Sequence, residues 1–329
     1  MHMSDALLSP AVGGVFWAAS AGLVAYSAKK IAAEDDDRSV PLMGVTGAFV
    51  FAAQMINFAI PGTGSSGHLG GGLLLSILLG PYRAFLVLAS VLTVQALLFA
   101  DGGLLALGCN VFNLAFFPAF IAYPFIWRRL AGPDRRGPRM AAASVVAAVA
   151  GLVMGAVAVV LQTVFSGISE LTFGMFTTFM VPVHIAIGVV EGLVTWGVVG
   201  LVEQVEPGTL ERTRTRSSIG RGVMVLAVLT LLVGGILSWF ASSAPDGLEW
   251  SIGKVAGSAE LEAPDAPVYH WLSSVQEKLS VLPDYGFRSS GETASDGELS
   301  PVSLGTSVSG IVGALLVLFV GAVLGLAVR

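Results

Sequence analysis

The chain has 329 residues, of which 54% are hydrophobic and only 12% are charged, and its mean hydropathy is +0.81. Soluble proteins carry about 25% charged residues, so this composition excludes an ordinary soluble domain and indicates an integral membrane protein. The single cysteine, Cys109, excludes an internal disulfide, and the 41 glycines suit close helix packing in lipid.

Apolar segments predict an all-α integral membrane fold with about nine transmembrane helices. A helix needs roughly 20 apolar residues to cross a bilayer, and most of the segments are long enough. The third segment is short and starts in a run of glycines, which is typical of a half-helix fed by a re-entrant loop. In chain order the segments cover about residues 11–31, 41–60, 69–81, 84–100, 109–127, 140–165, 174–202, 222–241 and 304–327.

The distribution of basic residues predicts the orientation. Acidic and neutral residues precede the first apolar segment and Lys29 and Lys30 follow it, which reverses the charge order of a cleavable signal peptide. With the N-terminus outside and nine crossings, 14 of the 17 lysines and arginines lie inside, all but Lys254, Lys278 and Arg288. The positive-inside rule therefore predicts a multi-pass cell-membrane protein with its N-terminus outside and its C-terminus inside.

A polar stretch at residues 203–221 predicts a cytoplasmic linker between two modules. The first, residues 1–202, is expected to be a seven-helix permease module. The second, residues 222–329, is expected to hold two transmembrane helices joined by an extracytoplasmic loop at 242–302. That loop carries ten acidic residues, which suits attraction of cations, and it is expected to be a small acidic domain or a partly disordered excursion.

The chain begins Met1-His2, and this pair can offer three nitrogens to one metal ion: the α-amine, the deprotonated amide and the imidazole. Nitrogen ligands in a tetragonal arrangement favour Ni²⁺ or Cu²⁺. The arrangement needs Met1 to be retained, which the bulk of His2 favours, and a terminal histidine is more often simply solvated. His68 lies in the glycine-rich stretch 57–72, on the same side of the membrane, and would supply a fourth nitrogen. Asn57, at the start of that stretch, is a candidate outer-sphere or structural residue.

Further polar residues lie within the apolar segments. His184 and Glu191 are seven residues apart and share one helical face. Because a carboxylate inside a span costs a few kcal/mol, Glu191 is either a functional group facing a polar cavity or an interhelical hydrogen-bond partner. Asn110 and Asn113 could orient a ligating imidazole or could bond between helices. His270, in the acidic loop, is interpreted as ordinary surface or packing.

Motifs that would indicate an enzyme are missing. No lysine stands in a GxxxxGK[ST] phosphate-binding loop, and HExxH and GxSxG do not occur. The chain is therefore predicted not to be an enzyme, and uphill transport would take its energy from a partner or an ion gradient. Two alternatives stay open: a secondary metal transporter with Glu191 as the proton-coupling group, and a non-transporting membrane scaffold or sensor.

The N-terminal MHMSDALLSP resembles the MHIPDGFLSP opening of the CbiM/NikM family, the substrate-binding components of cobalt and nickel energy-coupling-factor (ECF) ABC transporters. Similar stretches follow in order over most of residues 1–202: PLMGVTGAFVFAAQMINFAIPGTGSSGHLGGG, QALLFADGGLLALGCNVFN and HIAIGVVEGLVT. The PDGLE sequence at 245–249 resembles the PDGLE domain, which accompanies these permeases fused or as a NikN-type subunit. Two departures are SDA in place of PDG at 4–6, and PGTGSSGH in place of PGGTSGH at 61–68, which changes the reach of the loop.

The resemblance implies a metal held by the Met1 amine, the His2 amide and imidazole, and His68. It implies no catalytic residue and no bound cofactor, with Ni²⁺ or Co²⁺ as the transported ligand. The implied partners are a transmembrane coupling (T) subunit, cytoplasmic ATPase subunits and membrane lipid, without nucleic acid. Nickel and cobalt members share these ligands, but the PDGLE domain and the square-planar chemistry favour nickel.

Overall fold

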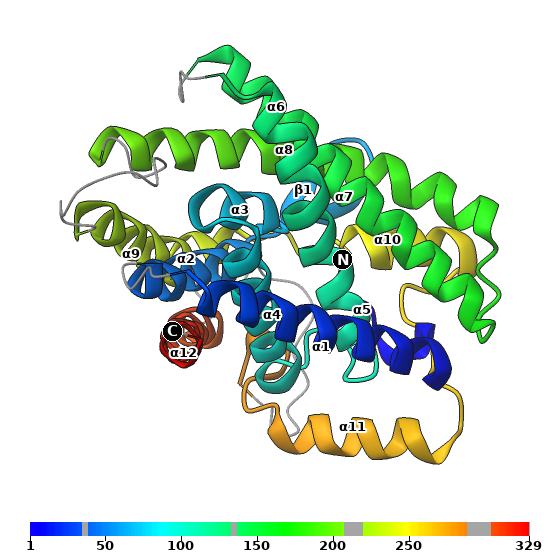
Figure 1. Cartoon of the computed structure of the whole chain (residues 1–329). Coiled ribbons are helices and arrows are strands. Elements are labelled where there is room, and N and C mark those ends of the chain that lie inside the picture. The colour runs from blue at the N-terminus through cyan, green and yellow to red at the C-terminus, as the bar shows by residue number, and fades with distance from the viewer. Residues whose placement is uncertain (35–38, 133–136, 207–219, 288–303, 329) are drawn as a thin grey trace.

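The computed structural model describes residues 1–34, 39–132, 137–206, 220–287 and 304–328 (Figure 1). Over these residues the regular secondary structure is helical apart from one short hairpin, which confirms the prediction of a mostly helical membrane protein. Six helices in the described ranges are long and apolar enough to cross a bilayer. They are α1 (Pro10–Ala32), α4 (Pro81–Leu98), the continuous helix Leu107–Leu130, α7 (Pro138–Ser166), α8 (Phe173–Val205) and α12 (Leu304–Ala327).

Three shorter helices stand where the sequence predicted further crossings. Helices α2 (Ser39–Gln54) and α9 (Gly220–Gly235) are apolar but have 16 residues each. Helix α3 (Gly72–Leu79) has eight, all buried, and at 1.5 Å per residue it is only about 12 Å long. Because the hydrocarbon core is about 30 Å thick, α3 cannot cross it and is a half-helix, as its glycine run indicated. The count of nine crossings is therefore not established by these lengths.

Small residues bring the long helices together. Alanine in place of Gly188 would place its Cβ 2.6 Å from the Cα of Val149, and Gly192 faces Val145 just as closely, so α7 and α8 pack almost backbone to backbone. Such contacts let helices gain dispersion energy in lipid, where burial of apolar surface gives no advantage. The helix Leu107–Leu130 consists of α5 (Leu107–Val111), the π-helical η2 (Phe112–Trp127) and α6 (Arg128–Leu130).

The start of the chain lies inside the molecule, where the N label stands among α5, α7 and α10 in Figure 1. Met1 is 4% exposed, and the short 3-10 helix η1 (Asp5–Leu7) that follows is largely buried. Strands β1 (Phe58–Ile60) and β2 (Ser65–Gly67) form an antiparallel hairpin in the glycine-rich stretch. The N-terminus is thus a packed part of the fold, which excludes the interpretation of His2 as a residue of a frayed end.

The described part of the acidic loop folds over the first module. It contains α10 (Gly247–Ala256), α11 (Pro267–Leu279) and η4 (Pro283–Tyr285), and η3 (Leu237–Phe240) precedes it. Helix α10 packs on β2 and α8, and α11 packs on α4. Helices α9 and α12, which flank the loop in the sequence, pack against α2. The loop and its two flanking helices therefore all contact the first module. Most of the expected linker at 203–221 lies outside the described residues, as does the loop beyond residue 287.

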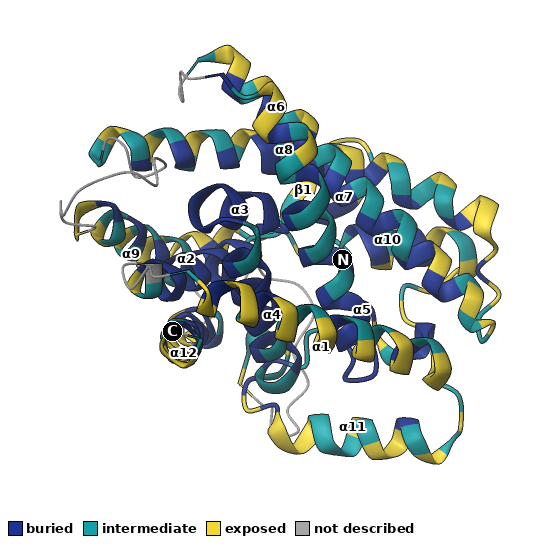
Figure 2. Cartoon of the chain, in the orientation of Figure 1, coloured by how far each residue is buried: buried dark blue, intermediate teal, exposed yellow. Residues whose placement is uncertain are grey.

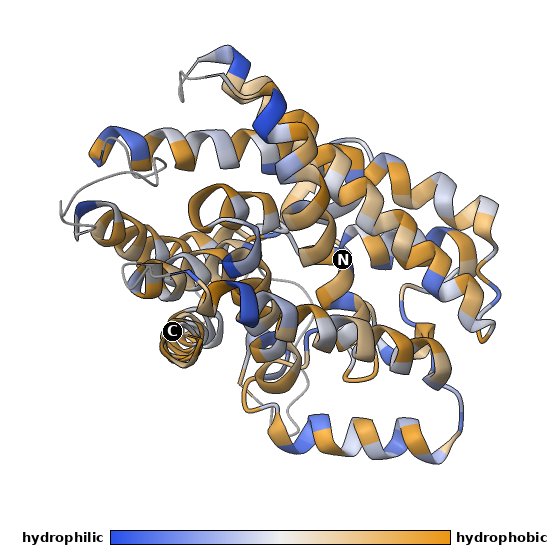
Figure 3. Cartoon of the chain, viewed as in Figure 1, coloured by the Kyte–Doolittle hydropathy of each residue, from blue (hydrophilic) through white to orange (hydrophobic). Residues whose placement is uncertain are grey.

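The outer faces of the long helices are apolar. Figure 2 shows exposed residues along α1, α8 and α12, and Figure 3 shows the same helices mostly in the colours of hydrophobic residues. Phe319 on α12 is 64% exposed and Phe165 at the end of α7 is 76% exposed. Large apolar side chains on an outer helix face match contact with lipid chains rather than with water.

Candidate metal site

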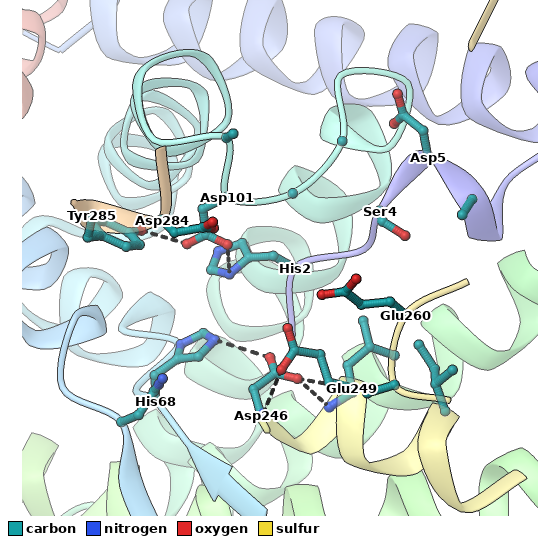
Figure 4. Close-up of a pocket in the computed structure, with 18 of the residues that line it drawn as sticks. His2, Ser4, Asp5, His68, Asp101, Asp246, Glu249, Glu260, Asp284 and Tyr285 are labelled. Carbon is teal, nitrogen blue, oxygen red and sulfur yellow. Dashed lines mark hydrogen bonds and ion pairs between the residues drawn. The ribbon is translucent and has the colours of Figure 1, made fainter. Parts of the chain in front are cut away.

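The amine of Met1 has two partners, of which the sequence predicted one, His68, and not the other, Asp246. Its nitrogen is 2.8 Å from Nε2 of His68 and donates to Oδ2 of Asp246, also at 2.8 Å. His68 belongs to the glycine-rich stretch, and Asp246 belongs to the PDGLE sequence of the second module. Figure 4 shows His2 and His68 near each other, with Asp246 beside His68 and the start of the chain running between them and the acidic residues of the loop.

Asn110 fixes the path of the N-terminal segment. Its Oδ1 accepts from the Met3 amide at 2.8 Å, and its Nδ2 donates to the Met3 carbonyl at 3.1 Å, as a neighbouring strand would. The Gly103 amide donates to the same carbonyl at 2.9 Å. Asn113 exchanges two hydrogen bonds with Gln162. Neither asparagine has a hydrogen bond to an imidazole of the described residues. Asn110 instead places the segment that carries His2, and Asn113 bonds between helices, the other option that the sequence left open.

The ring of His68 has a defined donor and acceptor side. Its Nδ1 lies 3.1 Å from the Leu69 carbonyl, which can only accept, so Nδ1 carries the hydrogen. Nε2 then presents a lone pair to the Met1 amine. A histidine that donates from one ring nitrogen to a carbonyl is the usual arrangement of a metal-ligating imidazole.

Glu191 holds the loop that follows His68. Its two carboxylate oxygens accept from the amides of Gly70 and Gly71 at 2.7 and 3.2 Å. From the other side, Gln54 donates to the Gly70 carbonyl at 2.9 Å. Gly71 has φ of +75° and starts α3, a conformation that favours glycine. These contacts support the structural interpretation of Glu191, and they make the carboxylate the anchor of the His68 loop.

His2 stacks on His68. The ring centroids are 5.0 Å apart and the planes are inclined by 10°. Nδ1 of His2 lies 3.1 Å from Oδ1 of Asp101, and the hydroxyl of Tyr285 in η4 donates to the other oxygen of that carboxylate. The second module therefore reaches both histidines, through Asp246 on one side and through Tyr285 and Asp101 on the other.

The electrostatics keep both imidazoles in the form that binds metals. Burial, followed by the positive charge of the N-terminus, lowers the pKa of His2 to about 3 and the pKa of His68 to about 3. Burial by itself would raise the pKa of Asp246, but the charges of the N-terminus and His68, together with the hydrogen bonds from the N-terminus and the Glu249 amide, outweigh burial and hold that pKa well below its usual range. At neutral pH the site thus has two neutral imidazoles beside the Asp246 carboxylate.

A polar cavity of about 820 Å³ lies over the two histidines. Asn57 lines it, and the Asn57 carbonyl accepts from the Ser242 amide at 2.7 Å. The carboxylates on its wall make it a suitable antechamber for a cation. They belong to Asp5, Asp101, Asp246, Glu249, Glu260 and Asp284.

His184 lies on the other side of the site. It lines a space of about 10 Å³, roughly the volume that one water molecule needs, together with Met1, His68 and Asp246. Its Nδ1 donates to the Met180 carbonyl at 2.7 Å, and its buried Nε2 has no hydrogen-bond partner among the described residues. His270, in contrast, is an exposed residue paired with Asp265 at 2.7 Å, as expected.

Comparisons with known proteins identify the family. Residues 2–209 match the family described as the cobalt uptake substrate-specific transmembrane region, and residues 220–329 match the PDGLE domain. This chain belongs to the cobalt uptake substrate-specific transmembrane family. It is thereby a multi-pass membrane component of metal uptake with a PDGLE domain at its C-terminal end.

Related proteins share the same two-part organisation. The chain is 33% identical over 328 residues to an Archaeoglobus fulgidus protein that carries the name fused nickel transport protein NikMN, covering 98% of this chain and 97% of that one. It is 29% identical to the fused nickel transport protein NikMN of Rhodobacter capsulatus, over 87% and 88% of the two chains. A crystal structure of a truncated transition metal transporter matches with a TM-score of 0.54 and 30% identity, covering 62% of this chain and 99% of that chain.

The sequence did not predict that Asp246, Asp101 and Tyr285 belong to the site. No three His, Cys, Asp or Glu side chains in the described part of the chain converge on one metal position, because the arrangement depends on the terminal amine. The PDGLE motif did contain a local signal. Asp246 and Glu249 form a capping box at the start of α10, which predicts a helix start but not the partner of the aspartate.

Proposed function

We propose that this chain is the substrate-specific component of an ECF-type ABC transporter that takes up Ni²⁺ in preference to Co²⁺. The ligands are the Met1 amine, the His2 amide and imidazole, and the His68 imidazole. The observation that carries the proposal is the 2.8 Å separation of the Met1 nitrogen and Nε2 of His68. With metal–nitrogen bonds of about 2.0 Å, as for zinc and imidazole, two neighbouring ligands at a right angle lie about 2.8 Å apart.

The chelate requires a movement of His2. A metal bound to the His2 amide nitrogen can reach only Nδ1 of the same side chain, because Nε2 points away from its own backbone. In the present structure Nδ1 lies against Asp101. Loading therefore turns the ring from the carboxylate towards the metal, and the stacked ring of His68 stands beside the position that it reaches.

The preference for nickel follows from the donor set. Four nitrogens in one plane favour Ni²⁺ or Cu²⁺ among the divalent first-row metals. The match to the Archaeoglobus fulgidus protein, named as a fused nickel transport protein, covers 98% of this chain and so extends through its PDGLE domain. The proposal includes a permease module at 1–202, a cytoplasmic linker at 203–221 and a PDGLE module at 222–329. It places the metal site outside the membrane and the C-terminus inside.

The energy for uptake comes from partner subunits in this proposal. The sequence has no phosphate-binding loop of its own, so ATP hydrolysis belongs to cytoplasmic ATPases joined to this chain by a transmembrane coupling subunit. The wide acidic cavity gathers the ion outside, and the Met1, His2 and His68 nitrogens select it.

Uptake of radioactive Ni²⁺ by cells that express the chain with its partner subunits tests the proposal. His2→Ala and His68→Ala each remove a ligand and should abolish uptake. His270→Ala is the matched control, since this exposed histidine pairs only with Asp265, and its uptake should equal that of the wild type. Normal uptake by His68→Ala would contradict the assignment of the site.

A further inference from the structure

The carboxylate of Asp246 lies where a metal held by the first module could also reach it. Its Oδ2 is 2.8 Å from the Met1 nitrogen and 3.9 Å from Nε2 of His68, and those two nitrogens are 2.8 Å apart. With bonds of about 2.0 Å, adjacent ligands of one metal are about 2.8 Å apart and opposite ligands about 4 Å apart. All three atoms therefore lie within the spacing that a single ion can bridge.

We propose that Asp246 is a further metal ligand, so that the transported ion is held by both modules of the chain. The inference rests on the proposed function, since it takes the Met1 amine and His68 as ligands. It assigns to the PDGLE aspartate a role in coordination and in the selection of the metal.

The charge of the site supports a carboxylate ligand. The Met1 side chain is 3% exposed and the Asp246 side chain is 16% exposed, and an uncompensated charge there is costly. In the empty site the ammonium of Met1 and the carboxylate cancel. On loading, the amine and the His2 amide each release one proton to water and the divalent ion enters, without any change of oxidation state. A divalent ion, one deprotonated amide and the Asp246 carboxylate again sum to zero. Asp246 thus balances the charge of the ligands in both states, and Asp101 beside His2 is the same in both.

The surrounding contacts hold the carboxylate in place. Oδ1 of Asp246 accepts from the amides of Leu248 and Glu249, both at 2.8 Å, which leaves Oδ2 for the site. The preceding residue is fixed to the hairpin of the first module, because the Ser66 amide donates to the Pro245 carbonyl at 2.8 Å. Asp246 and His68 are therefore carried on neighbouring, hydrogen-bonded segments.

An oxygen ligand changes the selectivity that the nitrogens alone would give. Four nitrogens in a plane match Ni²⁺ well, whereas Co²⁺ gains more from an additional donor outside that plane. Oδ2 of Asp246 reaches such a position on loading by closing its 3.9 Å separation from Nε2 of His68. Asp246 thus reduces the preference of the site for Ni²⁺ over Co²⁺. The ratio of the two dissociation constants is the appropriate measure, because any effect of a substitution on the empty protein is common to both metals and cancels.

Asp246→Asn separates this role from the capping of α10. Asparagine is as good an N-cap as aspartate and keeps an acceptor for the same two amides, but it lacks the charge. The purified full-length protein is titrated with Ni²⁺ alone and with Co²⁺ alone against a chelating dye, and the nickel-loaded forms are measured by X-ray absorption. The matched control is Asp265→Asn, in the same loop, where the carboxylate is 99% exposed.

The wild type is expected to show an oxygen donor and more than four ligands on nickel. The spectrum of Asp246→Asn should lose that donor and gain the pre-edge feature of square-planar nickel. Its preference for Ni²⁺ over Co²⁺ should rise about tenfold, the smallest effect usual for the loss of a residue that supports a metal site. Asp265→Asn should match the wild type. The same spectrum and the same metal ratio in Asp246→Asn and wild type would overturn the inference. Failure of the proposed function shows separately, as unchanged Ni²⁺ binding in His68→Ala.

Discussion

Glu191 anchors the loop that presents His68, and its removal should loosen the site without touching a ligand. Glu191 is 2% exposed, and its carboxylate accepts the amides of Gly70 and Gly71 at 2.7 and 3.2 Å. In Glu191→Ala two buried N–H groups lose their acceptors, at a cost of about 1–3 kcal/mol each. We expect the free energy of local opening to fall by about 2–6 kcal/mol. In Glu191→Gln one amide oxygen remains as an acceptor, so the loss should be about half as large.

Two measurements on the purified protein follow from this contact. Hydrogen exchange of the amides in residues 69–75 should become faster by about two orders of magnitude in Glu191→Ala, since 1.4 kcal/mol corresponds to a factor of ten. The affinity for Ni²⁺ should fall about tenfold or more, as for other residues that orient a ligand. Glu262→Gln, an exposed carboxylate of the acidic loop, is the matched control.

The result that refutes this reasoning is unchanged exchange and unchanged Ni²⁺ affinity in Glu191→Ala. The competing hypothesis, in which Glu191 couples transport to a proton gradient, predicts a different pattern. Under that hypothesis Glu191→Gln would bind Ni²⁺ normally but stop uptake, and wild-type vesicles would take up metal without ATPase subunits.

Three further predictions follow. In Gly67→Ala the new Cβ meets the buried side chain of Ile187, so the melting temperature and Ni²⁺ affinity should both fall. Gly197, on the same helix as Ile187, faces open space, so Gly197→Ala should change neither. In Asn110→Leu the Met3 backbone loses its two hydrogen bonds with Asn110, and Ni²⁺ binding should weaken at least tenfold. Wild-type affinity in this variant would contradict the role of Asn110 in placing Met3. His2 and His68, with pKa values lowered to about 3, stay neutral where unfolded histidines bind protons, so their contribution to stability falls as pH drops from about 6.5 towards 3. The melting temperature should therefore fall less between pH 7.5 and 5.5 in His68→Gln than in the wild type; equal falls would contradict the assignment.

The sequence predicted the parts of the fold that depend on composition and local pattern. Long apolar runs must form helices in lipid, because the backbone has no other partner there, and this gave the long spans and the half-helix at Gly72–Leu79. The pairing of His2 with His68 could also be predicted, since charge sorting put both on one side of the membrane. Their stacking and the 2.8 Å contact of the Met1 amine with His68 could not.

The contacts that the second module makes with the metal site could not be predicted from the sequence. Asp246 is 245 residues from Met1, and the contact depends on backbone bonds such as that between Ser66 and Pro245, which leave no pattern in the side chains. Tyr285 reaches Asp101 in the same way, from a segment that was expected to be an excursion outside the membrane. Asn110 was a candidate because it is a polar residue in an apolar segment. Its partner could not be predicted, because it bonds to the backbone of Met3, and every residue has such a backbone.

The most direct test of the site is Ni²⁺ and Co²⁺ binding by the purified protein with its native N-terminus, beside a version with one additional residue before Met1. The extension converts the amine to an amide, removes one ligand, and has no room, because Met1 is 4% exposed and its nitrogen contacts both His68 and Asp246. We predict tight binding by the native chain and its loss on extension. Equal binding by both versions would contradict a site built on the Met1 amine.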